Sequence, residues 1–357
     1  MISILRLRFK KLLRGRRVVV TASSLFLFLL LSILSKSGKI DVSKNVIIIC
    51  SKLTSILYNN HTFRQINVTG ENLNSVNPGS SLPFDLRRTL SETRIIYNRV
   101  DKSGSRSLMN AYKQLCTVNG FSGNSSRIFL KRTLTLSEQR DLVAEIQSLK
   151  PPFIFDRHVY YIDFSTFGVR APSWINLIRE PVPHLASRYY YKRFGDKLEP
   201  GPRMGFNGTI EEFNQSFEDC VLLNKHECSV EGGFIIIPYF CGHEPACHVP
   251  SRWALERAKR NVIVKYAFVG ILEDFDSTLL VLEKIFPQFF TGLHLVYKQV
   301  KDNAIMYKSS NKIETHSNAK AVMKTRLSLE YEFYEFVRDR LEMIKKQLNI
   351  SLLDNSL

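Results

Sequence analysis

Residues 95–112 read IIYNRVDKSGSRSLMNAY, and this stretch decides the fold. The apolar run 95–97 has the length of a buried strand, and apolar residues then recur at helical spacing from Leu108. Between them lies a loop of small and basic residues: Lys102, Ser103, Gly104, Ser105, Arg106 and Ser107. A loop that leads from a strand into a helix N-terminus is how proteins hold a phosphate-like anion. Because the lysine precedes the glycine, unlike in the nucleotide P-loop, the loop indicates a different anion.

Apolar runs alternate with helical patterns along the rest of the chain. We expect strands at 95–97, 153–155, 159–164, 174–178, 234–237 and 267–271. We expect helices at 105–116, 136–149, 181–193, 251–260, 273–286 and 318–347. This alternation predicts an α/β fold with a central parallel sheet flanked by helices. In such sheets a ligand binds beyond the carboxyl ends of the strands, where the 101–107 loop would lie.

A second candidate anion site lies in residues 174–191, which read WINLIREPVPHLASRYYY. Arg179 follows the predicted strand directly, and Ser187 lies two turns into the next predicted helix. An arginine and a hydroxyl so placed can bind a phosphate, the arginine through two parallel hydrogen bonds. A lone strand-end arginine more often makes a structural ion pair, but the two loops together favour an anion site.

The N-terminus predicts a membrane anchor. Seven basic residues lie within positions 1–17, and residues 18–34 are apolar and uncharged. About 17 residues is the shortest run that crosses a bilayer as a helix, and the basic cluster would stay in the cytosol. We therefore expect a cytoplasmic tail at 1–17, a transmembrane signal-anchor at 18–34, a lumenal stem at 35–92 and a globular domain at 93–348. A cleaved signal peptide is the alternative, because small residues follow the apolar run.

The net charge of +17 narrows the choice of partner. When the seven basic residues of the tail are set aside, roughly +10 remains, so the globular part is itself basic. A basic surface attracts nucleic acid, anionic membrane or acidic polysaccharide. We do not expect nucleic acid as the partner of a lumenal protein, and an acidic polysaccharide is the expected one.

Sequons and cysteines agree with a lumenal domain. Six N-glycosylation sequons lie at Asn60, Asn67, Asn124, Asn207, Asn214 and Asn349. Four of the six cysteines lie close together: Cys220, Cys228, Cys241 and Cys247. In an oxidising compartment the pairs 220–228 and 241–247 would close two short loops. Zinc is the alternative, because His226, His243 and His248 lie nearby, although the usual C-x2–4-C pair is missing.

Two segments carry a family resemblance. YNRVDKSGSRS (97–107) and INLIREPVPHLASRYYYKRFGD (175–196) resemble the 5′-phosphosulfate and 3′-phosphate loops of Golgi sulfotransferases. The donor in that family is 3′-phosphoadenosine 5′-phosphosulfate (PAPS). The resemblance is strongest to the uronyl and heparan sulfate 2-O-sulfotransferases, which include the insect Pipe protein, and it covers roughly residues 93–347. Supporting stretches are RHVYYIDF (157–164), IIPYFCGHEPAC (236–247), WALERAKRNV (253–262) and EYEFYEFV (330–337). The RHV sequence favours the uronyl and Pipe branch.

The resemblance implies a role for each matched residue. The six loop residues 102–107 would hold the 5′-phosphosulfate. The 3′-phosphate and the rest of the nucleotide would be held by Arg179, Ser187, Lys308, Ser310 and Lys312. His158 matches the catalytic base, and Arg99 and Asp196 match positions that face the sugar acceptor. The family's two lumenal disulfides match the pairs 220–228 and 241–247.

The chain departs from the family pattern at three points. Asp101 replaces the proline often found before the lysine, which puts the donor geometry in question. Asp156 stands where heparan-type members carry a second histidine, which leaves the choice of uronic acid open. The chain ends soon after the last predicted helix, without the long tail of the heparan enzyme, so a homo-oligomer is neither predicted nor excluded.

The sequence therefore predicts a PAPS-dependent 2-O-sulfotransferase, a single-pass type II Golgi membrane protein with a lumenal catalytic domain. Its acceptor would be a uronic acid in a heparan, dermatan or chondroitin chain, or in another uronate-containing glycan. His158 would remove the hydroxyl proton, and Lys102 would stabilise the charge that develops on the phosphosulfate. No metal is expected, since no pair of carboxylates stands near either loop in the sequence. Two alternatives stay open: a catalytically inactive polyanion-binding relative, and a lumenal nucleotide-dependent kinase.

Overall fold

The structure is a computed structural model that describes residues 93–128 and 131–350. The expected tail, anchor and stem, with the sequons at Asn60 and Asn67, lie outside the described residues. Within the described ranges, no single helix has both the length and the apolar character needed to cross a bilayer. One pair, Leu272–Ile285 with Pro287–Val300, meets that test jointly but is bent by 120°.

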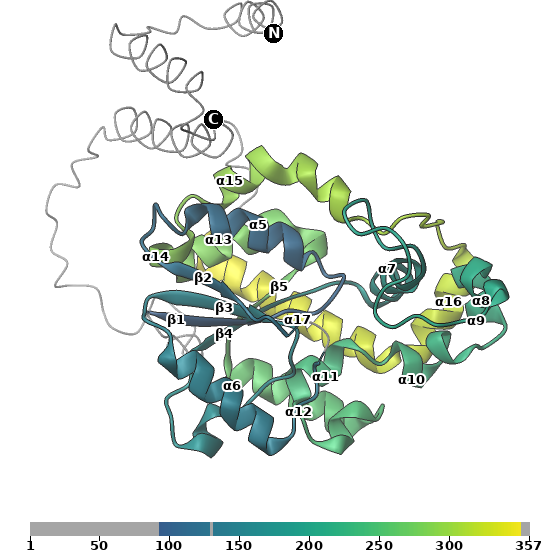
Figure 1. The fold of residues 1–357 in the computed structure, drawn as a ribbon, viewed down its shortest axis with the longest axis horizontal. Coiled ribbons are helices and arrows are strands. Elements are labelled where there is room, and N and C mark those ends of the chain that lie inside the picture. Colours follow the sequence, from purple (N-terminus) through teal and green to yellow (C-terminus); the bar gives the residue numbers. More distant parts are fainter. Residues whose placement is uncertain (1–92, 129–130, 351–357) are drawn as a thin grey trace, which may run out of the picture. The chain divides into compact units, whose positions relative to one another are not determined.

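In the described part of the chain, five parallel strands form one sheet in the order β2-β3-β1-β4-β5 (Figure 1). The strands are β1 (Arg94–Asn98), β2 (Ser122–Ser125), β3 (Phe153–Arg157), β4 (Ser173–Ile178) and β5 (Tyr266–Ile271). The central strand is β1, in which Ile95 pairs with Ile154 of β3 on one side and Ser173 of β4 on the other. Such strands read as apolar runs because both faces of the sheet are covered.

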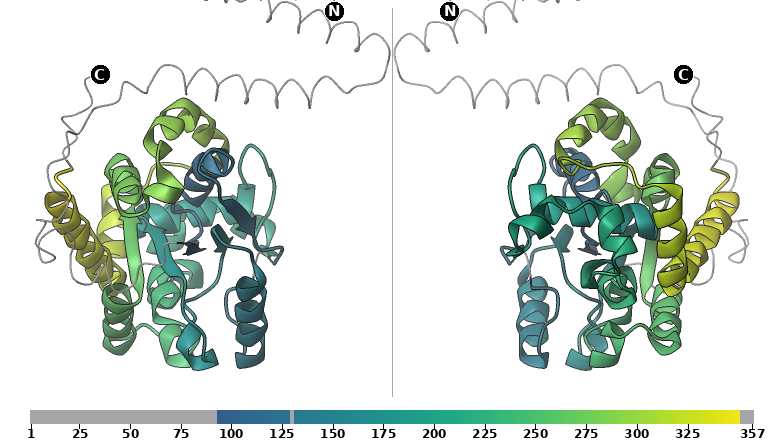
Figure 2. Two further views of the ribbon diagram at one scale, coloured as in Figure 1. Left: turned by 90° about the vertical axis from the view of Figure 1, so that its left-hand side faces the viewer. Right: turned by 90° about the vertical axis from the view of Figure 1, so that its right-hand side faces the viewer.

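Helices cover both faces of the sheet (Figures 1 and 2). One face carries α5 (Ser105–Leu115), α13 (Phe275–Ile285), α14 (Pro287–Phe290) and α15 (Leu293–Val300). The other carries α6 (Leu136–Ser148), α11 (Ile236–Cys241) and α12 (Arg252–Val264). The long helix α17 (Ser328–Gln347) packs against β5, α12 and α13.

A group of helices lies beyond the carboxyl end of β4 (Figure 1). It comprises α7 (Pro181–Phe194), α8 (Ile210–Asn214), α9 (Phe217–Leu222), α10 (Val230–Gly233) and α16 (Ser317–Arg326). Short 3-10 helices connect the elements: η1 (Phe164–Phe167), η2 (His226–Cys228), η3 (Pro245–His248), η4 (Leu272–Asp274) and η5 (Lys301–Tyr307). A second core cluster, separate from that of the sheet, joins α7, α9 and α16 through Leu185, Phe217 and Met323.

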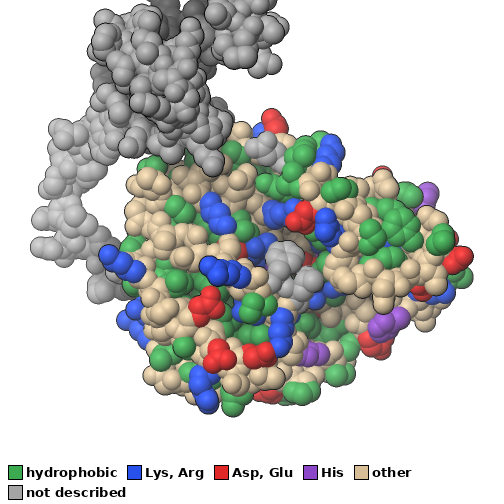
Figure 3. All heavy atoms as spheres, viewed as in Figure 1, with side chains coloured by type: hydrophobic (Ala, Val, Ile, Leu, Met, Phe, Trp, Pro, Cys, Tyr) green, Lys and Arg blue, Asp and Glu red, His purple; other side chains and the backbone are tan. Residues whose placement is uncertain are grey.

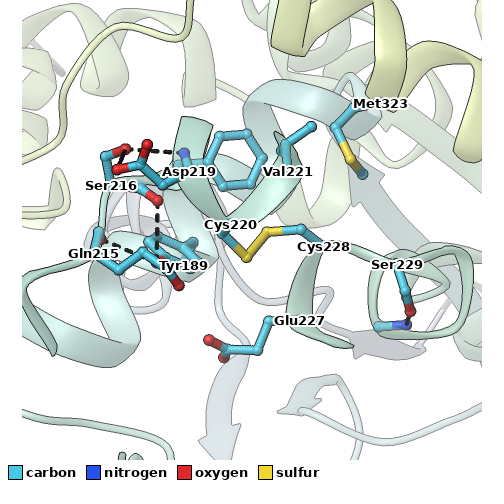
Figure 4. Close-up of a disulfide and its surroundings, with 12 residues drawn as sticks. Tyr189, Gln215, Ser216, Asp219, Cys220, Val221, Glu227, Cys228, Ser229 and Met323 are labelled. Atoms are coloured by element: carbon cyan, nitrogen blue, oxygen red, sulfur yellow. Dashed lines mark hydrogen bonds between the residues drawn. A yellow bond between two sulfur atoms is a disulfide. The ribbon is translucent and has the colours of Figure 1, made fainter. Parts of the chain in front are cut away.

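Both expected disulfides are present. Cys220 and Cys228 are joined beside the second core cluster, with Cα atoms 5.9 Å apart (Figure 4). Cys241 and Cys247 are joined at the end of α11, with Cα atoms 5.4 Å apart. Next to the first disulfide, the Tyr189 hydroxyl donates to the carbonyl oxygens of Gln215 and Ser216 (Figure 4). The disulfide and these bonds fix the 215–228 segment against α7.

Two expected strands are wrong. Residues 159–164 are mostly buried but form no strand, because the chain leaves the sheet after β3 and the Tyr161 amide donates instead to the carbonyl of Tyr239. Residues 234–237 lead into α11, whose first N–H groups bind the side chain of Glu330. Both runs are apolar because they are buried, and burial alone does not distinguish a strand from a loop or helix. The polar edge strand β2 carries no such apolar signal and was missed.

The helix expected at 318–347 is two helices, α16 and α17. The backbone leaves helical geometry at Leu327 (ψ 27°), whose side chain packs in the second core cluster. Among the four described sequons, Asn207, Asn214 and Asn349 are exposed. Asn124 lies in β2 and donates to the Ser122 hydroxyl at 3.0 Å. Glycosylation at each remains a prediction.

Candidate active site

A cavity of about 590 Å³ opens beyond the carboxyl ends of the strands. Eleven of the residues singled out in the sequence line it: Arg99, Lys102, Gly104, Ser105, Arg106, Ser107, His158, Arg179, Ser187, Lys308 and Lys312. Most of them come together because β1, β3 and β4 run parallel, so the segments that follow these strands reach the same edge of the sheet. Lys308 and Lys312 approach from the segment that follows η5. Ser103, Ser310 and Asp196 lie outside the lining.

The anion loop has a backbone shape that requires glycine. Gly104 has φ +80°, and a Cβ atom there would lie 2.5 Å from Cδ1 of Leu272. Lys102 also adopts a left-handed conformation, with φ 59°. Gly104 is the N-cap of α5 and provides no side chain to cap the helix. The first N–H groups of α5 are therefore left for a ligand, at the end of the helix that carries partial positive charge.

Lys102 and Lys312 are the two lysines of the cavity whose pKa is lowered. Burial, with Arg106 nearby, lowers the pKa of Lys102 to about 8. Its Nζ lies 3.8 Å from the centre of the Tyr191 ring and donates to the Tyr307 carbonyl at 3.4 Å. Burial, with Arg179 nearby, lowers the pKa of Lys312 to about 8. Both lysines lie where a bound anion would favour the charged form.

The second loop meets the 308–312 segment across the cavity. Arg179 follows β4, and its guanidinium donates to the Lys102 carbonyl at 3.4 Å. Ser187 lies in α7, with its hydroxyl 3.1 Å from that of Ser309. The Ser310 amide donates to the carbonyl of Gly195 at 2.9 Å and ties the segment down. Within the 308–312 segment, Ser309 lines the cavity and the predicted Ser310 does not.

The tautomer of His158 follows from its hydrogen bond. Its Nδ1 lies 2.7 Å from the carbonyl oxygen of Arg99. A carbonyl can only accept, so Nδ1 carries the hydrogen and Nε2 is the basic nitrogen of the neutral ring. Burial, with the cation of Arg99 nearby, lowers the pKa of His158 to about 4. His158 is thus a neutral base at the wall of the cavity at physiological pH.

Three buried carboxylates hold arginines around the cavity. Asp101 accepts from Arg188 Nε at 2.9 Å, and Asp156 accepts from Arg99 at 2.7 Å. Asp196 binds Arg106 and also accepts from the amide groups of Leu198 and Glu199. The side chain of Asp196 is fully buried beneath Arg106, so its expected contact with a sugar stays a prediction.

Eight other lining residues were missed in the sequence: Arg132, Tyr191, Met204, Leu272, Tyr297, Ala304, Tyr307 and Ser309. Tyr191 belongs to a run of three tyrosines in α7, and Arg132 belongs to a loop without a recognisable pattern. In contrast, Lys192 and Arg193 near the end of α7 both pair with Glu227 at 2.7 Å and lie outside the cavity lining. The one sequence signal that could have placed Tyr191 in the cavity is the preference of tyrosine for sites with one polar and one apolar side.

The charged side chains that line the cavity are almost all positive. Its lining contains seven cationic side chains, those of residues 99, 102, 106, 132, 179, 308 and 312, and one carboxylate, that of Asp101. Figure 3 shows Lys and Arg side chains gathered in the middle of this face of the molecule. A cavity with this balance binds a ligand that carries several negative charges.

Comparisons with known proteins agree with this geometry. The model of the Sulfotransferase family matches residues 88–341. The uronyl 2-sulfotransferases of Mus musculus and Homo sapiens are 37% and 36% identical over 277 residues, which is 76% of this chain and 66% of theirs. The heparan sulfate 2-O-sulfotransferase 1 of Gallus gallus is 34% identical over 259 residues, 70% of this chain and 71% of its own.

A crystal structure of mouse sulfotransferase SULT7A1 complexed with PAP aligns with a TM-score of 0.32 and 12% identity, over 75% of this chain and 91% of that one. The chain spans slightly under two thirds of the length of the two uronyl relatives. The family match covers most of the chain, including every element that lines the cavity. This protein belongs to the sulfotransferase family.

Proposed function

We propose that the protein transfers a sulfonate group from PAPS to the 2-hydroxyl of a uronic acid residue in a glycosaminoglycan or a related glycan. One observation carries the proposal. A neutral histidine, His158, lies on the wall of the same cationic cavity as the anion loop at Lys102. A base and a site for a charged donor in one cavity are the two requirements of this reaction.

The cavity offers distinct positions for the parts of PAPS. The loop 102–107 and the N-terminus of α5 suit the 5′-phosphosulfate, and Arg179 with Ser187 suits the 3′-phosphate. Leu272, Tyr297 and Ala304 line an apolar part that suits a flat purine ring. Lys308 and Lys312 border the same space. Together these residues account for most of the lining.

The chemistry follows from the base and the anion loop, which line the same cavity. As the sugar oxygen attacks sulfur, Nε2 of His158 accepts the hydroxyl proton. The bond between sulfur and the bridging phosphate oxygen breaks, and PAP leaves with the negative charge. Lys102 and the N–H groups at the start of α5 stabilise that charge with little rearrangement, because they are already held in place.

The acceptor assigned by this proposal is an acidic polysaccharide. Arg99 of the protein contacts the acceptor sugar. The relatives include uronyl and heparan sulfate enzymes, so heparan, dermatan and chondroitin chains are the acceptors to test. The proposed address is the Golgi membrane, with a type II anchor at 18–34 and a lumenal domain stabilised by the two disulfides.

The test is transfer of labelled sulfate from PAPS to desulfated heparan, dermatan and chondroitin chains, followed by disaccharide analysis. We expect the label on the 2-position of a uronic acid. Transfer of labelled phosphate from γ-labelled ATP, with no sulfate transferred from PAPS, would support a kinase. Donor binding without transfer to any of these chains would support an inactive relative.

The base assignment has its own test. His158→Ala should lower kcat by at least about 100-fold, because a positioned base contributes that much. Binding of PAP should persist, because the donor contacts lie on other residues. The matched control is His226→Ala, since His226 is exposed and lies outside the cavity lining. A His158→Ala enzyme with unchanged kcat would show that another group is the base.

A further inference from the structure

Asp156 is a buried carboxylate two residues before His158, at the carboxyl end of β3. Its side chain has no exposed surface and does not line the cavity. It accepts three hydrogen bonds: from Arg99 at 2.7 Å, from the Tyr112 hydroxyl at 2.9 Å and from the Ser125 hydroxyl at 2.6 Å. Asp156 cannot touch a ligand directly and can act only through these partners.

Arg99 is the partner of Asp156 that reaches the cavity. Its backbone is fixed at two points, because its amide donates to the Arg157 carbonyl at 2.9 Å and its own carbonyl accepts from His158. Its guanidinium is fixed at one point, NH1, by Asp156. One residue therefore orients the base through its backbone and presents a cation through its side chain.

The guanidinium of Arg99 keeps donor capacity. Its Nε is buried and has no hydrogen-bond partner among the described residues. Arginine has five N–H donors in a planar group, so a carboxylate that holds one nitrogen leaves the others available and fixes the plane in which they lie. A buried donor of this kind is costly unless a ligand satisfies it.

The other two partners of Asp156 come from elements near the donor site. Tyr112 lies on α5, the helix whose N-terminus belongs to the anion loop, and Ser125 ends β2. The Tyr112 and Ser125 hydroxyls both bind Oδ2, while Arg99 binds Oδ1. The carboxylate is therefore held in one orientation, and it transmits that orientation to Arg99.

We propose that Asp156 is a positioning residue, which holds the Arg99 guanidinium in the orientation that binds the acidic acceptor sugar. This inference rests on the proposed function, because it needs an acceptor with negative charge. In heparan-type enzymes the resemblance implies a second histidine at the position of Asp156. Here Asp156 does not line the cavity, and it acts on the acceptor through Arg99.

The test uses the full-length enzyme and the variant Asp156→Asn. We expect the KM for the uronate polymer to rise by about 10-fold or more, since a buried charged partner of Arg99 is lost. The affinity for PAP should stay within about twofold of the wild type, because the donor contacts are separate. A purely structural role would lower PAP affinity and acceptor use together.

A double-mutant cycle with Arg99→Gln decides whether the effect acts through Arg99. If it does, the double variant has the acceptor KM of Arg99→Gln alone. If the two effects multiply, Asp156 acts independently and the proposal is wrong. The matched control is Asp163→Asn, a carboxylate paired with Lys265 at 3.1 Å outside the cavity lining, for which we expect an unchanged KM.

Tyr112→Phe provides a milder variant if Asp156→Asn does not fold. It removes one hydrogen bond to Oδ2 and should raise the acceptor KM by a few fold, again without effect in the Arg99→Gln background. An unchanged acceptor KM in both variants of an active enzyme overturns this inference and leaves the proposed function intact. A wild-type enzyme that transfers sulfate to no uronate overturns the proposed function itself.

Discussion

At the scale of single residues, Asp101 explains why the anion loop tolerates an acidic residue beside its lysine. Burial acts to raise the pKa of Asp101, but the cations of Arg132 and Arg188 outweigh it and hold that pKa well below its usual range. The Tyr239 hydroxyl also donates to this carboxylate at 3.2 Å. The negative charge of Asp101 is thus balanced by two arginines of the protein. It positions these arginines and does not repel an anionic donor such as PAPS.

The lysines predict a pH dependence of donor binding. Lys102 and Lys312 have pKa values lowered to about 8, and a bound anion favours their charged forms. At pH 7 both are mainly charged in the free protein, whereas at pH 9 they must take up protons on binding. The affinity for PAP should therefore fall as pH rises above about 8, by up to about tenfold per pH unit for each lysine.

Calorimetry in two buffers of different ionisation enthalpy measures this proton uptake directly. Lys102→Arg is the informative variant, because arginine stays charged at pH 9. We expect it to take up fewer protons and to show a shallower pH dependence than the wild type. If wild-type affinity were the same at pH 7 and pH 9, neither lysine would titrate at the donor site.

His158 predicts the acidic limit of catalysis. Its pKa is lowered to about 4 in the free protein, so the neutral base persists far below the ordinary value of about 6.5. The pH profile of kcat/KM reports the free enzyme. We therefore expect that any acidic decline in kcat/KM caused by His158 lies below pH 5. A decline centred near pH 6.5 would indicate a solvated histidine and contradict the buried position found here.

At the scale of elements, Glu330 ties α17 to α11. This fully buried carboxylate accepts from the amide groups of Ile236 and Ile237 at 3.0 to 3.1 Å. Burial raises its pKa to about 8, although these N–H groups act in the other direction. Because the first N–H groups of a helix have no partner within it, Glu330 takes the place of a local cap.

Glu330→Ala should lower the free energy of unfolding by about 2–4 kcal/mol, because it leaves two buried N–H groups without an acceptor. Glu330→Gln keeps one oxygen acceptor and should cost less. The measurement is urea unfolding of the purified protein. Glu332→Gln is the matched control on the same helix, since the side chain of Glu332 is 40% exposed and pairs with Arg252 and Lys259, and it should change stability by less than about 1 kcal/mol. Equal losses for positions 330 and 332 would contradict the capping role.

The sequence was sufficient for elements whose signal is local. Four of the five strands in the described part of the chain follow from short apolar runs, and the anion loop follows from Gly104 between a strand and a helix. Contacts between distant segments were not accessible in this way. Nothing near Glu330 in the chain indicates that it caps α11, and β2 is a polar edge strand held by its pairing with β3.

The residues of the candidate site also fall into two groups: those with a local sequence signal and those placed by tertiary contacts. Residues directly after strands, such as Arg99, His158 and Arg179, line one cavity because parallel strands end at one edge of the sheet, and their roles remain predictions. The residues that approach from elsewhere, such as Arg132 and Tyr297, follow from tertiary packing. The burial of Asp196 likewise depends on its pairing with Arg106, 90 residues away in the chain.

At the scale of the whole described domain, two buried histidines and a third that is partly buried couple stability to pH. His158 donates to the carbonyl of Arg99, and His184 of α7 lies 2.7 Å from the carbonyl of Asp101, so both hold the backbone that leads into the anion loop. His243 accepts from the amide of Leu134 at 3.0 Å. Burial lowers the pKa of each of these three histidines to about 4.

Stability should therefore fall as the medium becomes acidic. Between pH 6.5 and pH 4 the unfolded chain binds protons at these histidines and the native protein does not, so the free energy of unfolding rises with pH in this window. From pH 7 to pH 5 we expect a loss on the order of 1–2 kcal/mol for each fully buried histidine. Urea unfolding at the two pH values measures it. His184→Gln, in which the amide can still donate to Asp101, should show a smaller loss, and His226→Gln on the surface should match the wild type. If His184→Gln lost as much stability as the wild type between pH 7 and pH 5, the buried imidazole would not be the group that titrates.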